Sequence, residues 1–370
     1  MVSGMEVPRK FLLLSMCGLG DAVCYLPFLK ALRVSYPQSR IVVVVATDQA
    51  RDIIAANLQD VEVIVFNRSR HRGLFGLARL LLAFRQCRFD VVMSRAPIDS
   101  LRVPLFAFLS GAKNRVGAKS ERLAFLYGRR VSVQRDVHVV ERYRQLLKGV
   151  GVEVSTESFF PVLDPPAEAK RSALRLWEDA GLCKASQVIG FALGADTTIR
   201  GRWIPGLKRW NAKGYADVAR WLAEEAGTRI AVFGAGAESS LAEAIAAESG
   251  VSVANLCGKT RVGELQWLLR KCKALVSNDT GTMHLAAALG TPVVALFGPT
   301  SPKSFAPMGD RHLVIQGPAP CSPCFPHPIC NQGTCRAMDA ISPLQVIQGL
   351  SGLLYSRSAA SSHSPLTPAG

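Results

Sequence analysis

The chain has 370 residues, of which 49% are hydrophobic and 19% are charged. A single hydrophobic core stops growing near roughly 250 to 300 residues, so this length predicts two domains, and the apolar content excludes a disordered protein. The formal charge of +16 favours anionic partners. Because the basic residues are scattered as pairs such as Arg129-Arg130, without interleaved aromatics, we expect no nucleic acid but a membrane surface or an acidic substrate.

The first apolar run follows Arg9 and Lys10 and resembles a signal peptide, or a lipoprotein site ending at Cys17. Met16, however, stands where a small residue should precede the modified cysteine, and the run leads directly into Gly18-Leu19-Gly20-Asp21. We therefore predict a buried first strand followed by a loop. The apolar stretches all fall short of the ~18 residues that span a bilayer, so any membrane contact is expected to be peripheral.

The first half of the chain alternates apolar, β-branched runs with helical stretches. This pattern predicts strands at 11–14, 41–45, 61–66 and 91–94, and a helix at 22–36 that ends before Pro37. Strand, helix and strand in this order form the βαβ unit of a parallel sheet. The proline-rich segment 155–170 interrupts the pattern, so we place the domain boundary there, with domains at 1–165 and 166–355.

The second half restarts the alternation. It predicts helices at 167–180, 215–226, 239–249, 265–270 and 282–289, and strands at 188–193, 229–233, 251–255, 274–277 and 293–297. The predicted fold class is α/β, with two Rossmann-like, doubly wound domains and a cleft between them. The tail 356–370, rich in Ser, Ala and Pro, is expected to be disordered.

A carboxylate, Asp21, follows the first predicted strand. Open α/β sheets bind ligands at the carboxyl ends of their strands, so Asp21 could act there as a general base, or it could cap the next helix. Val23 replaces the third glycine of a dinucleotide-binding fingerprint that would begin at Gly18, so the loop gives little support to an oxidoreductase.

The strongest local motif begins at Asn278-Asp279-Thr280-Gly281 and continues through Met283-His284 into an Ala-rich helix that Gly290 closes. Asp279 or Thr280 can cap this helix, and the amides at its positive end would suit a pyrophosphate. An ordinary capped helix, with His284 merely packing, is the alternative.

Two further groups follow strands of the second domain. In Lys208-Arg209-Trp210, Lys208 could neutralise a departing diphosphate or simply be a solvated loop charge. Glu238, which follows Gly234-Ala235-Gly236-Ala237, could accept hydrogen bonds from ribose hydroxyls or cap a helix.

Taken together, Gly-Leu-Gly-Asp at 18–21, Lys-Arg-Trp at 208–210 and the motif from Asn278 to Pro292 resemble glycosyltransferase family 9, the ADP-heptose:lipopolysaccharide heptosyltransferases. The resemblance covers about residues 10 to 350, includes Arg115-Val116-Gly117 and the segment 255–260, and is closer to the heptosyltransferase II branch. Two departures concern the donor: the loop before Lys208 is longer and more basic, with Arg200 and Arg202, and no proline follows Trp210.

The resemblance implies a GT-B fold and inverting transfer of heptose from ADP-heptose to an inner-core acceptor hydroxyl, on Kdo or heptose, with no cofactor and no metal. It also implies an acidic lipid-linked glycan as acceptor, a monomer, and a cytoplasmic location at the inner face of the inner membrane. The implied catalytic residues are Asp21 as base and Lys208 at the leaving group. The implied donor-binding residues are Gly20, Glu238, Thr260, Asp279, Thr280, Gly281 and His284, and the implied acceptor-binding residues are His138 and Arg142.

Ten cysteines are present, and the six outside the late cluster lie in apolar or helical segments, as expected of reduced thiols in the cytosol. The late cluster Cys321, Cys324, Cys330 and Cys335 could hold zinc, or could form a structural loop or a labile disulfide, which we prefer.

Other classes remain as alternatives. A transfer enzyme with another nucleotide sugar or acceptor shares all these motifs. A sugar-nucleotide epimerase or NAD-binding enzyme would need an intact glycine fingerprint and a catalytic Tyr-Lys pair. A non-catalytic glycan-binding member of the fold would not need Asp21 and Lys208.

Overall fold

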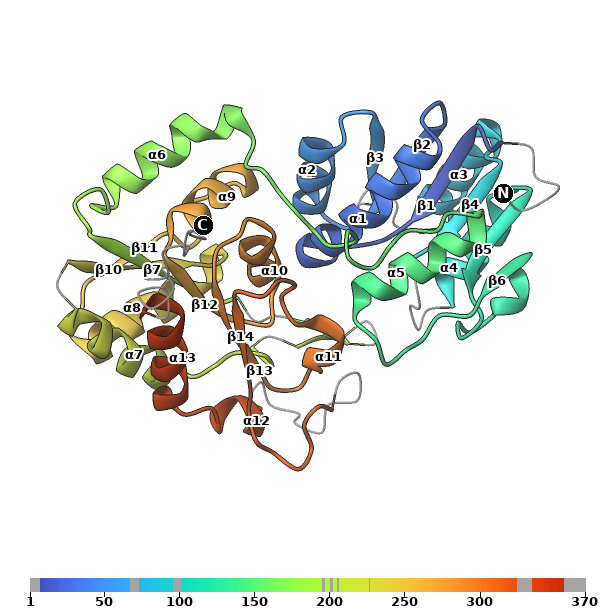
Figure 1. Ribbon diagram of the computed structural model, residues 1–370. Helices are drawn as coiled ribbons and strands as arrows, with labels where there is room; N and C mark the ends of the chain where they lie inside the picture. Colours follow the sequence, from blue (N-terminus) through green and yellow to red (C-terminus); the bar gives the residue numbers. More distant parts are fainter. Residues whose placement is uncertain are drawn as a thin grey trace, which may run out of the picture. The chain divides into compact units, whose positions relative to one another are not determined.

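The computed structural model describes residues 7–66, 73–95, 101–194, 197–199, 202–204, 206–225, 227–324 and 335–355. The chain divides into two compact units, Met1–Asp164 and Pro165–Gly370. Each unit is a parallel sheet with helices on both faces (Figure 1). The tail 356–370, Arg200 and Cys330 lie outside the described residues.

The first unit is built on a six-stranded parallel sheet in the order β3-β2-β1-β4-β5-β6. Its strands are β1 (Lys10–Leu14), β2 (Arg40–Val45), β3 (Val61–Val65), β4 (Val91–Ser94), β5 (Asn114–Ala118) and β6 (Arg129–Val131). Its helices are α1 (Leu19–Ser35), α2 (Asp48–Asn57), α3 (Gly73–Cys87), α4 (Arg102–Leu109) and α5 (Val139–Leu147), with the 3₁₀ turns η1 (Ala124–Leu126) and η2 (Lys148–Val150).

Two groups of helices cover the two faces of this sheet. Helices α2 and α5 both pack on α1. On the other face, side chains of β1, β2 and β4 pack with α3, α4 and the segment around η1; this cluster includes Leu12, Leu14, Val42, Val44, Leu80, Phe84, Val92, Val103, Ala107 and Tyr127. The central strands are thus buried on both sides, which explains their continuous apolar sequences.

The second unit also has a six-stranded parallel sheet, in the order β11-β10-β7-β12-β13-β14. Its strands are β7 (Gln187–Ala192), β10 (Thr228–Phe233), β11 (Val253–Asn255), β12 (Ala274–Asn278), β13 (Val293–Phe297) and β14 (His312–Gln316), and β8 (Thr197–Ile199) with β9 (Arg202–Ile204) forms a separate antiparallel hairpin. Its helices are α6 (Lys170–Asp179), α7 (Ala212–Glu224), α8 (Ser239–Ser249), α9 (Val262–Lys271), α10 (Gly281–Ala288), α11 (Pro302–Phe305), α12 (Arg336–Asp339) and α13 (Pro343–Tyr355), with the 3₁₀ turns η3 (Ala167–Ala169) and η4 (Gly236–Glu238). Helix α13 lies beside α7 (Figure 1).

The α/β, doubly wound fold class predicted from the sequence is confirmed. Helix α8 begins at Ser239 as predicted, but some predicted helix starts are late, since α1 begins at Leu19 and α9 at Val262, three residues before each predicted start. In both cases the first turn carries polar residues that the apolar pattern does not include. Strands β5, β6 and β14 were not predicted; β6, with the sequence Arg-Arg-Val, is a short edge strand without an apolar run.

The described helices include none that is long and apolar enough to cross a bilayer.

Candidate functional site

Asp21 lies at the carboxyl edge of the first sheet, where it forms an ion pair with Arg95. Strands β1 and β4 pair in parallel, so the residues that follow them meet at one edge. Arg95 Nη1 lies 2.6 Å from Asp21 Oδ2, and 39% of the Asp21 side chain is exposed against 16% for Arg95. The N-cap of α1 is Gly18, and Asp21 stands in the first turn. Asp21 is therefore a half-exposed carboxylate at a positive helix end, held by a mostly buried guanidinium.

Arg95 is a permanent cation in this setting. Burial by itself lowers the pKa of its guanidinium, but the Asp21 carboxylate more than offsets this, and the pKa of Arg95 is raised. Tyr143 of α5 also interacts electrostatically with Arg95 and packs edge-on against Tyr25 of α1, with 5.0 Å between ring centroids. The Asp21–Arg95 ion pair therefore lies near the two packed aromatic rings of Tyr25 and Tyr143.

A buried network fixes the strand end that carries Arg95. Glu121 accepts hydrogen bonds from Ser94 Oγ and Tyr127 Oη, both at 2.7 Å, and burial raises the pKa of Glu121. Ser94 immediately precedes Arg95. The network thereby connects the end of β4 to the segment after β5 and sets the position of the Asp21 partner.

His138 and Arg142, predicted to bind the acceptor, both stabilise the start of α5. His138 is the N-cap, and its Nδ1 accepts a hydrogen bond from Val140 N at 3.3 Å. Arg142 Nε donates to the Val137 carbonyl at 3.0 Å, and burial lowers the pKa of Arg142. Tyr143 of α5 interacts electrostatically with both Arg95 and Asp21.

In the second unit, Asn278 ties three segments together at the carboxyl end of β12. Its Nδ2 donates to the carbonyls of Leu193 and Gly194 at 3.2 and 3.3 Å. Its Oδ1 accepts from Trp210 N and Tyr215 Oη, both at 3.2 Å. The side chain is fully buried, and all its hydrogen-bonding capacity at these atoms is used to fix the Lys-Arg-Trp segment against β7 and β12.

The two cations before Trp210 reach two different buried carboxylates. Lys208 Nζ lies 2.7 Å from Asp279 Oδ2, and Arg209 Nη2 lies 3.6 Å from Glu238 Oε1. Asp279 follows β12 and Glu238 follows β10, so both acids stand at the same sheet edge. Burial raises the pKa of Asp279, but Lys208 and then His284 act against it, and the pKa is lowered overall. Asp279 is an ionised, paired carboxylate.

Glu238 also closes the 3₁₀ turn η4. Its Oε2 accepts a hydrogen bond from Ala235 N at 2.6 Å. The capping role considered as an alternative for Glu238 is thus present, together with the Arg209 contact.

Thr280 and Gly281 form the start of α10, but neither Asp279 nor Thr280 caps the helix with its side chain. Thr280 occupies the N-cap position without a side-chain cap hydrogen bond among the described residues, and the Asp279 carboxylate turns to Lys208 instead. The capping prediction for these two side chains is therefore wrong. The reason is that the lysine competes for the carboxylate, which leaves the amides at the helix start uncapped by a side chain. His284, one turn further on, is buried.

Thr260 lies in a loop that packs directly on the Glu238 turn. Gly258 has φ +72°, and a Cβ at that position would be 2.8 Å from the Cα of Gly236. Gly258 N donates to the Gly234 carbonyl at 2.9 Å. The segment 257–260 and the segment 234–238 thus form one layer at the edge of the sheet.

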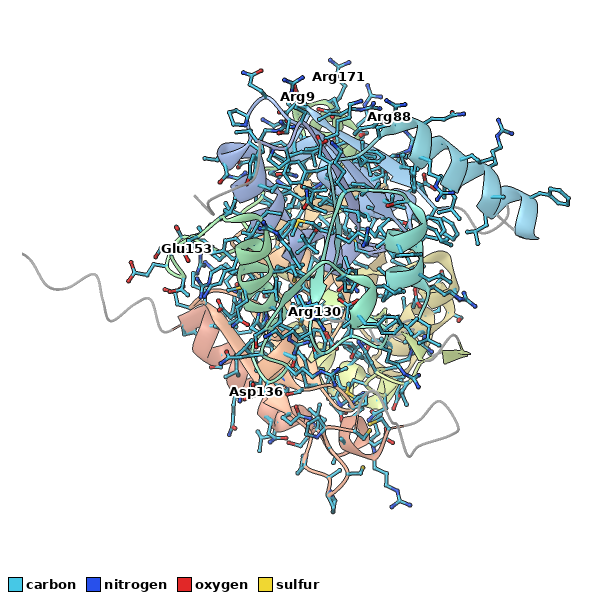
Figure 2. All side chains as sticks on the ribbon, turned by 90° about the vertical axis from the view of Figure 1, so that its right-hand side faces the viewer. Arg9, Arg88, Arg130, Asp136, Glu153 and Arg171 are labelled. Atoms are coloured by element: carbon cyan, nitrogen blue, oxygen red, sulfur yellow. The ribbon has the colours of Figure 1, made fainter. Side chains whose placement is uncertain are left out.

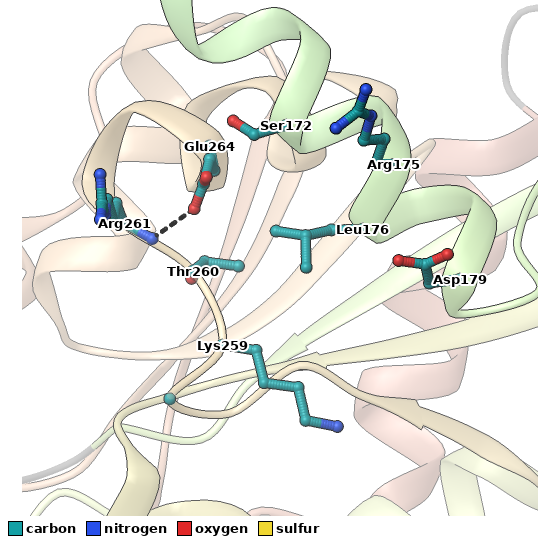
Figure 3. Close-up of a pocket in the computed structure, with 9 residues that line it drawn as sticks. Ser172, Arg175, Leu176, Asp179, Lys259, Thr260, Arg261 and Glu264 are labelled. Carbon is teal, nitrogen blue, oxygen red and sulfur yellow. Dashed lines mark hydrogen bonds between the residues drawn. The ribbon is translucent and has the colours of Figure 1, made fainter.

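The same loop borders a cavity of about 570 Å³. Figure 3 shows Lys259, Thr260 and Glu264 facing Leu176 and Asp179 of α6 across this hollow. Glu264 Oε2 accepts a hydrogen bond from Arg261 N at 2.8 Å, which fixes the start of α9. The cavity wall comes from α6 and the 258–264 segment, which includes Thr260.

The late cysteines form no metal centre in the described part of the chain, where no group of three or more His, Cys, Asp or Glu side chains could hold a metal. Cys335 is buried, and Cys321 and Cys324 are half-buried. Cys330 lies outside the described residues.

Three features of the site were not predicted from the sequence. They are the Arg95 side chain beside Asp21, the contact of Arg209 with Glu238, and the hydrogen bonds by which Asn278 connects neighbouring segments. The usable signal for Arg95 is its position directly after a predicted strand, next in the sheet to the strand before Asp21.

Comparisons with known proteins identify the family and the fold of the chain. The family model described as glycosyltransferase family 9 (heptosyltransferase) matches residues 77–333. Lipopolysaccharide heptosyltransferase 2 of Salmonella typhimurium is 30% identical over 319 residues, or 83% of this chain and 88% of that protein. The structure of ADP-heptose lipopolysaccharide heptosyltransferase II of Escherichia coli superimposes with a TM-score of 0.72 at 25% identity, covering 95% of this chain and 100% of that one.

A third protein, the Escherichia coli heptosyltransferase WaaC solved with ADP, has a TM-score of 0.67 at 21% identity, covering 93% of this chain and 99% of that one. These matches confirm the GT-B fold class. The chain belongs to glycosyltransferase family 9, the heptosyltransferase family, and is a glycosyltransferase.

Proposed function

We propose that this enzyme transfers heptose from ADP-heptose to a hydroxyl of Kdo or heptose in the inner core of lipopolysaccharide. Support comes from the relatives, whose names specify lipopolysaccharide heptosyltransferase 2 and ADP-heptose. A solved heptosyltransferase of the same fold was crystallised with ADP. The observation that carries the proposal is the Lys208–Asp279 pair at the uncapped start of α10.

The start of α10 is the proposed site for the diphosphate. Amides of Thr280 and Gly281 lie at the positive end of the helix, and Lys208 adds a full positive charge nearby. Asp279 holds Lys208 at this place through a 2.7 Å ion pair. We assign the stabilisation of the departing ADP to these groups, with His284 and Asp279 positioning the donor.

The nucleoside is proposed to lie at the layer made by segments 234–238 and 257–260. The Glu238 carboxylate accepts one backbone hydrogen bond through Oε2, and its Oε1 remains at the Arg209 side, where ribose hydroxyls could reach it. Thr260 and the backbone around Gly258 border the adjoining cavity. Gly20, in the first turn of α1 directly before Asp21, is the remaining predicted donor contact.

Asp21 is proposed as the general base. Its carboxylate takes the proton from the acceptor hydroxyl while that oxygen bonds to the anomeric carbon and the bond to the β-phosphate oxygen of ADP breaks. Attack opposite to the leaving group inverts the anomeric carbon. Arg95 orients the carboxylate through its ion pair. We also propose that His138 and Arg142, at the start of α5, contact the acceptor.

The direct test combines ligand-induced stabilisation with turnover. ADP and ADP-heptose should raise the unfolding midpoint in a concentration-dependent way, and UDP, GDP and NAD should not. Lys208→Ala should weaken the ADP effect, whereas Lys213→Ala, on the exposed first turn of α7, should leave it unchanged. Stabilisation by UDP or GDP in preference to ADP would replace the donor assignment, and stabilisation by NAD alone would reject the proposal.

A further inference from the structure

Basic residues occur throughout the chain, but the net positive charge is concentrated in one segment, where few acidic residues balance them. Residues 63–135 contain 15 Lys and Arg and three Asp and Glu, a net charge of +12, against +16 for all 370 residues. This segment includes helices α3 and α4 and the turn η1. A fifth of the sequence therefore carries three quarters of the net charge.

Large apolar side chains on these same elements face solvent. Phe75 and Leu82 of α3 are 93% and 58% exposed, Leu105 and Phe108 of α4 are 46% and 47% exposed, and Phe125 of η1 is 72% exposed. A spacing of seven residues places Phe75 and Leu82 on one face of α3. Exposed aromatic and aliphatic side chains that recur on one face indicate an interaction surface.

The three elements are neighbours on the same face of the first sheet. The ring of Phe84 on α3 packs edge-on against Phe106 on α4, with 6.1 Å between centroids, and α4 lies beside η1. Because Leu80, Phe84, Val103 and Ala107 point into the core under these helices, the exposed residues form their outer side. We call this outer side, with Phe75, Leu82, Leu101, Leu105, Phe108 and Phe125, the α3–α4 surface.

Arginines lie on the same elements as these apolar side chains. Arg79 and Arg85 of α3, together with Arg122 beside η1, are exposed, and the Arg115 guanidinium lies 5.4 Å from the centroid of the Phe108 ring. Arg88, at the end of α3, lies on the same side of the unit as Arg9 (Figure 2).

No exposed acid balances these arginines among described residues 73–95 and 101–135. Glu121 is buried, and Asp90 is half-buried and accepts hydrogen bonds from the backbone of Arg9 and Lys10.

We propose that the α3–α4 surface docks on a bilayer of anionic phospholipids. Apolar side chains from three elements would enter the headgroup boundary, and the surrounding arginines would bind lipid phosphates while their aliphatic stems stay in the apolar layer. A second copy of this chain fits poorly as the occupant, because it would bring another strongly basic surface face to face with the first.

This inference rests on the proposed function only in that a lipid-linked acceptor brings the enzyme to a membrane. Docking can be measured without nucleotide sugar or acceptor, so its failure and the failure of the transfer proposal are separate results.

The experiment is co-sedimentation of the full chain with vesicles of phosphatidylglycerol and phosphatidylcholine, or of phosphatidylcholine alone, at low and high salt. Wild type should bind the anionic vesicles, and high salt should weaken binding. Arg79→Glu with Arg122→Glu should weaken binding at least about 25-fold, since each juxtamembrane cation contributes about fivefold. Phe75→Ser with Leu82→Ser should weaken it about tenfold or more.

Matched controls change the same chemistry elsewhere. Arg171→Glu with Lys213→Glu alters the net charge equally, and Val34→Ser removes a side chain that is 80% exposed at the end of α1. Both should bind vesicles as wild type does, and all variants should keep wild-type turnover with an acceptor dispersed in detergent.

Three results would overturn the proposal. Equal binding of wild type to neutral and anionic vesicles contradicts the role of the arginines. Loss of binding in the arginine variant but not in the Phe75, Leu82 variant shows that no apolar insertion occurs. A dimer that these substitutions dissociate, in sedimentation velocity without vesicles, assigns the surface to a second copy.

Discussion

The carboxyl edges of the two sheets use the same kind of ion pair with opposite exposure. In the first unit the carboxylate is the accessible member: Asp21 is 39% exposed and Arg95 16%. In the second unit the carboxylates are the hidden members: Asp279 is 6% and Glu238 5% exposed, against 16% for Lys208 and 34% for Arg209. Within each pair the more exposed member is the one that can meet a ligand: a carboxylate can take a proton, and a cation can receive a departing anion. This difference is what the two proposed roles, base in the first unit and leaving-group stabilisation in the second, rest on.

The largest expected effect comes from removing the accessible carboxylate. Asp21→Asn keeps the shape of the side chain but cannot accept the proton, so we expect turnover to fall about 10³-fold or more, with the ADP-induced rise in the unfolding midpoint unchanged. Steady-state kinetics and thermal unfolding with ADP measure the two quantities. Asp48→Asn, in the exposed first turn of α2, is the control. Turnover within tenfold of wild type would show that another group is the base.

Replacing Lys208, the cation paired with Asp279 in the second unit, should lower the rate less than Asp21→Asn does. It should also lower the stability of the folded protein. Lys208→Ala should lower kcat about 10²-fold and weaken ADP binding. It also leaves Asp279 as a buried charge without this partner, which should cost about 3 kcal/mol of stability.

The double variant Lys208→Ala with Asp279→Asn separates these two consequences. It should regain most of the lost stability, because the remaining side chain is neutral, and none of the lost turnover. Recovery of both in the double variant would mean that Lys208 only neutralises Asp279 and has no role toward the donor.

Replacing Arg95 tests whether the buried cation of the first edge only positions Asp21. In Arg95→Met the guanidinium that orients the Asp21 carboxylate is lost, so we expect kcat/KM to fall about tenfold while the ADP-induced rise in the unfolding midpoint stays unchanged. Arg95→Lys, which keeps a cation beside Asp21, should restore part of the lost kcat/KM. Loss of the ADP-induced rise in Arg95→Met would indicate a purely structural role.

The smallest expected effect concerns the layer that carries Glu238. In Gly258→Ala the new methyl group would lie 2.8 Å from the Cα of Gly236, and φ +72° adds backbone strain, so we expect a loss of about 1–3 kcal/mol. Thermal unfolding with and without ADP is the measurement. Gly250→Ala, with φ +71° and no atom near the added methyl group, isolates the backbone strain. An equal loss in both would show that the two segments are not tightly packed.

The fold was largely predictable because the central strands are buried on both faces and are therefore apolar without interruption. The edge strand β6 was missed because its Arg-Arg-Val sequence has no such run. The sequence allowed three site residues to be predicted, because each follows a strand or stands at a helix start: Asp21, Lys208 and Asp279. Their partners could not all be named from the sequence: Arg95 is 74 positions from Asp21, and only the pairing of β1 with β4 brings the two together.

The hydrogen bonds of the Asn278 side chain bear on how much the loop between Gly194 and Trp210 can vary in length. Its amide holds the carbonyls of Leu193 and Gly194, where the loop with the β8–β9 hairpin begins, and its oxygen holds Trp210 N, where that loop ends. Both anchors hold the two ends of the loop to β12. We therefore expect changes in the length of the hairpin to be tolerated without moving Lys208, which precedes the second anchor by two residues.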